Sequence, residues 1–88
     1  MNYKVTECSM WGEMELFSRT LGITSDIQLL RRQAAQEARN LFESFQRSFP
    51  GTSIEIEFLG DKIIVSYKVI TMMGKPVVVK HIFAIIEC

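Results

Sequence analysis

The feature that most constrains the fold is the segment Ile54–Val69, IEIEFLGDKIIVSYKV, where apolar and polar residues alternate on both sides of a Gly-Asp pair. A period of two places successive side chains on opposite faces of a strand. Gly60-Asp61 fits a two-residue type II′ turn between antiparallel strands. In that register three apolar pairs face one another: Phe58 with Ile63, Ile56 with Val65, and Ile54 with Tyr67. The sequence therefore predicts a β-hairpin, because a shift by one residue would destroy this match.

The residues after this hairpin predict a third strand. A three-residue loop with Gly74 in the left-handed conformation places Pro76 opposite Ile70, where the missing N–H of proline costs nothing. The following strand is apolar on both faces, which is typical of a strand covered on both sides. One face is expected to carry Val77, Val79, His81, Phe83 and Ile85, and the other Val78, Lys80, Ile82, Ala84 and Ile86.

Upstream of the hairpin, one-face periodicity predicts an amphipathic helix of about six turns. We expect Ser25 to be its N-cap, with Gln28 completing a capping box, Asp26 in the first turn and Arg47 in the last. Pro50-Gly51 ends it. Its apolar stripe is Ile27, Leu30, Ala34, Ala38, Leu41, Phe45 and Phe49. Its opposite side carries Arg31, Arg32, Gln36, Arg39, Glu43 and Arg47.

The N-terminal region predicts two further elements. Asn2–Cys8 alternates as a strand, and Lys4 and Thr6 on one of its sides suit a strand at the edge of a sheet. We expect it to pair with the last strand. Glu13–Leu21 is predicted to be a short helix, because apolar residues recur at helical spacing before Gly22 in a C′ position. Those residues are Met10, Met14, Phe17 and Leu21.

Together these elements predict a single α+β domain over residues 1–88. It has two layers, in which one long amphipathic helix packs on a three- to four-stranded antiparallel sheet. The expected order is strand, short helix, long helix and three strands. This order resembles the cystatin-like arrangement, and its helix and three strands are shared with double-stranded RNA-binding and ribosome-hibernation domains. The resemblance is in topology alone, because the cystatin hairpin motif is missing from Glu55–Val65.

Composition excludes several classes of protein. Ten basic and ten acidic residues give a formal net charge of zero, which is atypical of a protein that grips phosphate backbones and of an acidic DNA mimic. The segment Met1–Met10 has no signal-peptide pattern, and no apolar run reaches the ~20 residues that span a bilayer. Cys8 and Cys88 are expected to be free thiols, with a disulfide between them as the alternative. These features indicate a cytoplasmic protein that does not act at a membrane.

No group of residues predicts catalysis, a metal site or a cofactor. His81 is the only histidine and falls on the expected core face, so we interpret it as a buried structural residue. Nothing near Cys8 or Cys88 in the sequence activates a thiol. A pocket around His81, Tyr67 and Cys8 is the weakest hypothesis that we consider. The sequence therefore predicts a protein that is not an enzyme.

The second face of the predicted sheet is more apolar than the surface of a two-layer domain needs to be. Exposed apolar patches larger than a few hundred Å² are uncommon on soluble monomers and usually mark an interaction site. Three kinds of cover remain open: the segment Met10–Leu21 folded over this face, a second copy of the chain, or a different protein.

We therefore expect a small, non-catalytic interaction module, such as an accessory regulator or inhibitor of the kind that phages and bacteria encode. It would bind a protein partner or itself, as a homodimer, through the second sheet face. The predicted contact residues are Ile64, Ile70, Val78, Ile82 and Ile86, with Trp11, Met72 and Met73 at the rim. The alternative is a nucleic-acid-binding module that uses Arg31, Arg32, Arg39 and Arg47, which the neutral charge disfavours.

Overall fold

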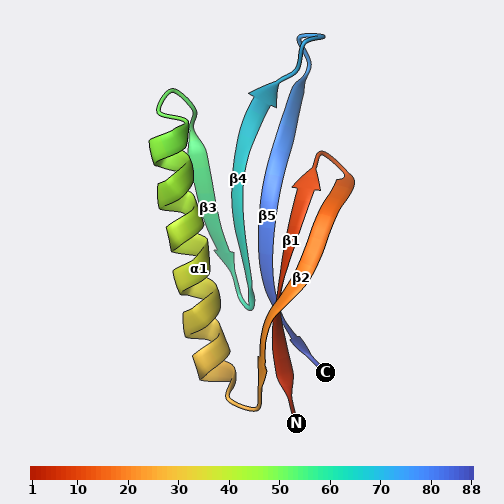
Figure 1. Ribbon diagram of the computed structural model, residues 1–88, viewed down its shortest axis with the longest axis vertical. Coiled ribbons are helices and arrows are strands. Elements are labelled where there is room, and N and C mark those ends of the chain that lie inside the picture. Colours follow the sequence, from red (N-terminus) through yellow and green to blue (C-terminus); the bar gives the residue numbers. More distant parts are fainter.

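A computed structural model describes residues 1–88 as one helix and five strands. The elements are β1 (Tyr3–Trp11), β2 (Met14–Thr24), α1 (Ile27–Ser48), β3 (Ile54–Leu59), β4 (Lys62–Ile70) and β5 (Pro76–Glu87). All five strands form a single sheet in the order β2-β1-β5-β4-β3, and every neighbouring pair is antiparallel. Figure 1 shows α1 running along this sheet. The α+β class and the single long helix are confirmed, but the sheet has five strands rather than three or four.

The additional strand is β2, and it corrects the prediction of a short helix over Glu13–Leu21. The turn Gly12-Glu13 joins β1 to β2, with Gly12 at a positive φ of 60°. The register with β1 shifts twice, between Ser9 and Met10 and between Val5 and Thr6. These irregularities insert Leu16 and Leu21 into β2, so that its apolar residues recur every three or four positions as they would in a helix.

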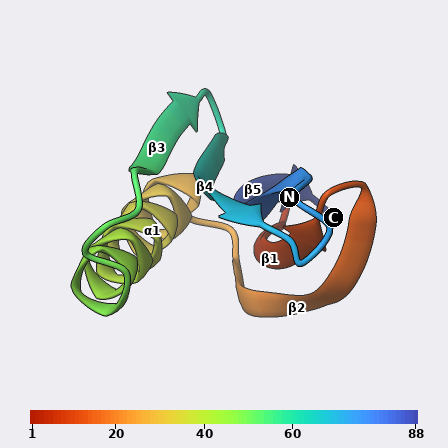
Figure 2. The ribbon, with the colours of Figure 1, turned by 90° about the horizontal axis from the view of Figure 1, so that it is seen from above.

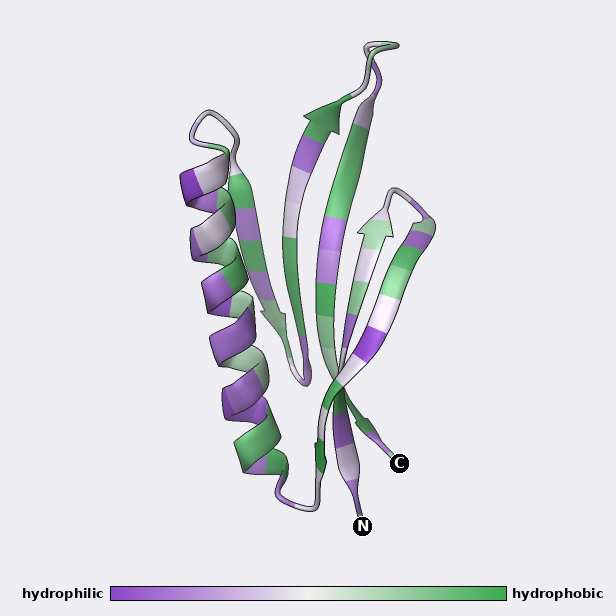
Figure 3. Cartoon of the chain, viewed as in Figure 1, coloured by the Kyte–Doolittle hydropathy of each residue, from purple (hydrophilic) through white to green (hydrophobic).

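The three C-terminal strands have the predicted register. Phe58 lies opposite Ile63, Ile56 opposite Val65, and Ile54 opposite Tyr67. Pro76 lies opposite Ile70, and Gly74 in the connecting loop has a φ of 77°. Figure 3 shows hydrophobic and hydrophilic residues alternating along β3, as the sequence pattern requires.

Strand β1 pairs with β5, as predicted, but it is not at the edge of the sheet. Its other side pairs with β2, so the two edges are β2 and β3. The polar residues Lys4 and Thr6 therefore face one side of an interior strand rather than an open edge.

The core lies between α1 and one face of the sheet. Its buried side chains come from the helix (Leu30, Ala34, Ala38) and from four positions on three strands (Val5, Ile63, Val65, Phe83). Figure 2, viewed from above, shows α1 on one side of the curved sheet. Since alternate strand residues point to opposite faces, these buried positions fix which side of every strand faces the helix.

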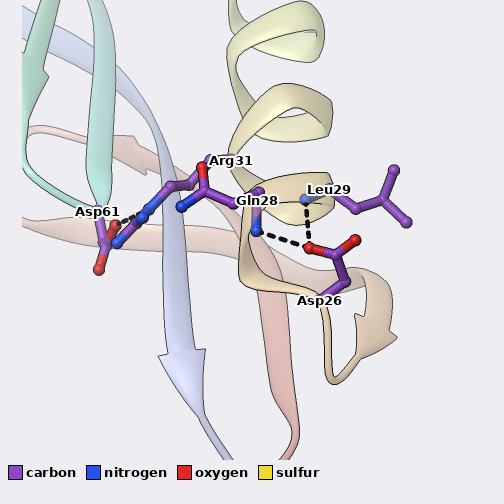
Figure 4. Close-up of polar contacts among 5 residues, drawn as sticks. All are labelled: Asp26, Gln28, Leu29, Arg31 and Asp61. Atoms are coloured by element: carbon purple, nitrogen blue, oxygen red, sulfur yellow. Dashed lines mark hydrogen bonds and ion pairs between the residues drawn. The ribbon is translucent and has the colours of Figure 1, made fainter.

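The helix begins one residue later than expected. Asp26, not Ser25, is the N-cap, and its Oδ1 accepts hydrogen bonds from the backbone N–H groups of Gln28 and Leu29 (Figure 4). Asp26 is thus outside the first turn, and no capping box forms between Ser25 and Gln28. At the other end Arg47 lies in the last turn, and the helix stops at Ser48 just before Pro50-Gly51.

Candidate functional site

The face of the sheet opposite α1, which we call the reverse face, is the candidate site. The chain has one helix, and all of its strands lie in the same sheet, so no element of the chain covers this face. The apolar residues of β3, β4 and β5 that point to it are Leu59, Ile64, Ile70, Val78, Ile82, Ala84 and Ile86. The polar ones are Glu55, Glu57, Lys62, Ser66, Lys68 and Lys80.

A shallow groove of about 910 Å³ crosses the reverse face from β3 over β4 to β5. Its apolar lining includes Ile64, Ile70 and Val78. Charged residues are interspersed with these apolar ones: Glu55 and Glu57 lie on β3, Lys80 lies on β5, and Lys68 lies on β4 between Ile64 and Ile70. The groove is only partly enclosed, so its shape suits an extended surface better than a small molecule, which a binding pocket largely surrounds.

The predicted partner-binding residues are only partly brought together. Ile64 and Ile82 lie side by side as a direct pair on β4 and β5, each half-buried in the middle of the reverse face. Ile70 and Val78 lie on the same face toward the loop between these strands. Ile86 is 45 % exposed near the other end of β5, opposite Lys4.

The three residues predicted at the rim of the reverse face do not lie together. Met72 and Met73 lie in the loop between β4 and β5 and are fully or almost fully exposed. In Figure 1 this loop extends beyond the end of α1. Trp11 does not belong to the reverse face, because it is opposite Val79, whose side chain is buried on the helix side. The N-terminal strand was expected to end at Cys8. Because β1 instead continues to Trp11, the alternation of side chains along the strand places the indole on the helix side.

The hypothesis that Met10–Leu21 covers the reverse face is wrong. Most of this segment is β2, which extends the sheet sideways beyond β1 instead of lying across β4 and β5. The reverse face is therefore free to be covered by something other than this chain.

Sequence reasoning missed a second exposed apolar group, which lies on the hairpin of β1 and β2. Met14 is 63 % exposed, Leu16 56 % and Phe17 44 %. Gly12-Glu13 was the available signal for this hairpin, because a glycine in a two-residue connection is typical of β-turns with positive φ.

His81 lies on the helix side, as predicted, with its ring 5.2 Å from the ring of Phe45. Its Nδ1 is buried and has no hydrogen-bond partner. Burial lowers the pKa of His81, and the nearby Glu7 carboxylate opposes this effect. Burial against Phe45 thus favours the neutral form of the ring.

The hypothetical pocket around His81, Tyr67 and Cys8 does not assemble. Cys8 is opposite Ile82, on the reverse face, while His81 and Tyr67 both contact Phe45 on the helix side. Cys8 Sγ lies 3.3 Å from Oε1 of Glu15. Desolvation and this carboxylate raise the pKa of the Cys8 thiol, which keeps it in the poorly nucleophilic protonated form. Both cysteines are free.

The arginines of the alternative hypothesis lie on the outer face of α1. Arg31, Arg32 and Arg39 line one shallow hollow, and Arg47 is not part of it. Nε of Arg31 already donates to Oδ1 of Asp61 at 2.9 Å (Figure 4). No aromatic side chain lines this hollow, so it lacks the stacking platform that single-stranded nucleic-acid sites combine with charge.

Two further observations concern the whole chain. No helix is long and apolar enough to cross a bilayer. Nowhere do three or more His, Cys, Asp or Glu side chains gather in a way that would hold a metal ion.

Comparison of the chain with known protein families, with curated proteins and with solved structures found no match.

Proposed function

We propose that this protein is a small, non-catalytic interaction module that binds another protein surface through its reverse face, as an accessory regulator or inhibitor does. The observation that carries the proposal is the pair Ile64 and Ile82 in the centre of a sheet face that no element of the chain covers. A two-layer domain needs only one apolar sheet face, and contiguous apolar surface beyond that usually serves recognition.

The composition of the groove supports a protein as the partner. Its lining combines apolar residues with acidic residues on β3 and basic residues on β4 and β5, and this mixture suits a protein surface, where apolar and polar contacts occur together. Met72 and Met73 lie past the Ile70 end of the groove. Methionine side chains adapt to differently shaped partners and are common on binding surfaces.

The test compares proteins retained from a lysate by the wild-type chain and by two variants. Ile82→Glu places a charge in the centre of the reverse face. Leu29→Glu is the matched control, since Leu29 is an exposed apolar residue on α1. We expect wild type and Leu29→Glu to retain the same specific proteins, and Ile82→Glu to lose them.

The proposal is contradicted if Ile82→Glu retains the same proteins as the wild type. A wild-type chain that retains nothing and is monomeric would contradict it as well. Circular dichroism of each variant confirms that the comparison is made between folded chains.

A further inference from the structure

The outer edge of β3 is an open edge of the sheet. Strand β3 is the last strand in the order and pairs with β4 alone (Figure 2). On the other side of β4, the N–H of Ile85 donates to the C=O of Asp61, which is a hydrogen-bonded position between the β4 side and β5. Such positions alternate along antiparallel strands, so the residues of β4 that bond to β3 are Lys62, Ile64 and Ser66.

The backbone groups on the outer side of β3 have no partner in the chain. Lys62, Ile64 and Ser66 pair with every second residue of β3, beginning at Leu59. The residues between them are Ile54, Ile56 and Phe58, whose N–H and C=O groups therefore point away from β4. None of these three residues takes part in a backbone hydrogen bond outside the paired strands. The edge thus offers three pairs of a donor and an acceptor to an added strand.

The opposite edge of the sheet, β2, is less suited to an added strand. Its register with β1 shifts at two places, and each shift disturbs the regular spacing of the outward backbone groups. Bulges of this kind are one of the devices that protect an edge from pairing. The pairing of β3 with β4 is unbroken from Ile54 to Leu59. The regular open edge is therefore that of β3.

The side chains of β3 indicate the chemistry of a strand that would fit this edge. Glu55 and Glu57 are exposed on the reverse face, and neither belongs to an ion pair of the chain. On the helix side Phe58 is 52 % exposed. A matching strand would carry basic residues toward the reverse face and apolar residues toward the helix side.

The basic residues of the reverse face leave this preference unchanged. Lys62 and Lys68 lie on β4 and Lys80 lies on β5, so all three are at least one strand further from the edge. A strand added to β3 lies about 4.8 Å from β3 and twice as far from β4. Its basic side chains would therefore lie closer to the two glutamates than to any of these lysines.

We propose that the outer edge of β3 binds an extended segment of another protein as an added, antiparallel strand, with two basic side chains opposite Glu55 and Glu57. The segment would form hydrogen-bonded pairs with Ile54, Ile56 and Phe58, which is recognition by strand addition. Its two basic residues would lie at the positions between these pairs, where opposed side chains are closest. This inference goes beyond the proposed function, because it uses the edge of the sheet and not the centre of the reverse face.

The same glutamates disfavour a second copy of β3 as the added strand. Two antiparallel registers bring the free backbone groups of two copies together with the longest overlap. One of them places Glu55 opposite Glu57 of the second copy, and the other places Glu57 opposite Glu57. Like charges directly opposite one another destabilise a strand pair, whereas opposite charges stabilise it. The charge of β3 thus selects a basic segment over a copy of itself.

The test measures binding of a synthetic peptide by NMR titration. The probe is a heptapeptide with blocked ends in which valine alternates with lysine, and the control peptide has glutamate in place of lysine. At an ionic strength of about 0.05 M, where screening is weak, we expect the lysine peptide to bind with a dissociation constant below about 1 mM. The glutamate peptide should not bind. The amide protons of Ile54, Ile56 and Phe58 should exchange more slowly when the lysine peptide is bound.

N-methylation separates strand addition from simple attraction of charge. Methyl groups on the valine nitrogens remove the N–H groups that would donate to β3, so this peptide should lose binding. Methyl groups on the lysine nitrogens of the backbone replace N–H groups that point away from β3, so this peptide should still bind. Both peptides keep the charge of the probe.

Charge reversal in the protein locates the site. The double variant Glu55→Lys with Glu57→Lys should bind the lysine peptide at least about tenfold more weakly and should gain binding of the glutamate peptide. The matched control is Glu37→Lys with Glu43→Lys, which makes the same change of net charge at exposed positions of α1. This control should bind the lysine peptide as the wild type does. Circular dichroism of each variant establishes that it is folded.

The inference is overturned if the lysine peptide does not bind at about 1 mM, if methylation of the valine nitrogens has no effect, or if the two double variants weaken binding equally. These outcomes are separate from those that test the proposed function. Ile82 lies on β5, two strands from the edge, so Ile82→Glu should leave peptide binding unchanged. A chain that loses its lysate partners on Ile82→Glu but never binds the peptide would overturn strand addition alone.

Discussion

Oε2 of Glu7 lies 2.8 Å from Nε of Arg19, across the pairing of β1 with β2. The side chain of Glu7 is 9 % exposed and that of Arg19 is 60 % exposed. A carboxylate is costly to bury without a partner, so the arginine that reaches in from the edge strand stabilises it. This ion pair connects β2 to the sheet, although β2 itself has no fully buried residue.

Removal of the arginine should therefore destabilise the fold. We expect Arg19→Ala to lower the free energy of unfolding by about 1–2 kcal/mol, less than for a fully buried pair because Arg19 faces solvent. Urea unfolding followed by circular dichroism measures this change. Arg32→Ala, on the outer face of α1, should change it by less than about 0.5 kcal/mol. Equal effects of the two substitutions would contradict the role of the ion pair.

The stability of the fold should depend on pH through His81. Burial lowers the pKa of His81 in the folded chain, so at pH values just below its unfolded-state pKa the unfolded chain binds more protons. The contribution of His81 to the free energy of unfolding is therefore fully present above its unfolded-state pKa of about 6.5 and is lost as the pH falls from there through the lower pKa of the folded chain.

The matched variant for this pH dependence is His81→Gln, which keeps a polar side chain but does not titrate. Urea unfolding at a series of pH values between about 7.5 and 5.5 should show a smaller slope for this variant than for the wild type. Identical slopes would show that other groups cause the dependence.

Local pattern was sufficient to predict the meander of β3, β4 and β5. In the hairpin Ile54–Val69 every helix-side position of one strand faces an apolar position of the other, so only one register buries them together. The long helix was equally predictable, because its apolar stripe contains the buried Leu30, Ala34 and Ala38. Period, turn residues and burial all agree in these elements.

The same reasoning failed for β2, for a physical reason that lies within the strand. Leu16 and Leu21 are inserted where the register with β1 shifts, and each insertion lengthens the spacing between residues on one face. A bulge depends on how two strands fit together, which the sequence of one strand does not contain. The error carried over to the site, since the supposed covering helix is a strand at the edge of the sheet.

The N-cap of α1 shows a smaller ambiguity with a direct test. Ser25 and Asp26 are both good capping residues, and the structure uses only Asp26. Asp26→Ala should lower the free energy of unfolding by about 1 kcal/mol, because two backbone N–H groups lose their acceptor. Ser25→Ala should change it by less than about 0.5 kcal/mol in the same urea titration. The opposite ranking would show that the cap is at Ser25.

The division between the two sheet faces can be tested at adjacent residues of β5. Phe83 is 2 % exposed in the core, whereas Ile82 points to the reverse face. Phe83→Ala should lower the free energy of unfolding by about 3–5 kcal/mol. Ile82→Glu, measured in dilute monomer, should lower it by only about 1–2 kcal/mol, because Ile82 is half-buried and loses only part of its apolar contacts. Urea unfolding at two protein concentrations separates monomer stability from any association. If Ile82→Glu unfolds the dilute monomer as severely as Phe83→Ala does, then Ile82 belongs to the core and is not free to contact a partner.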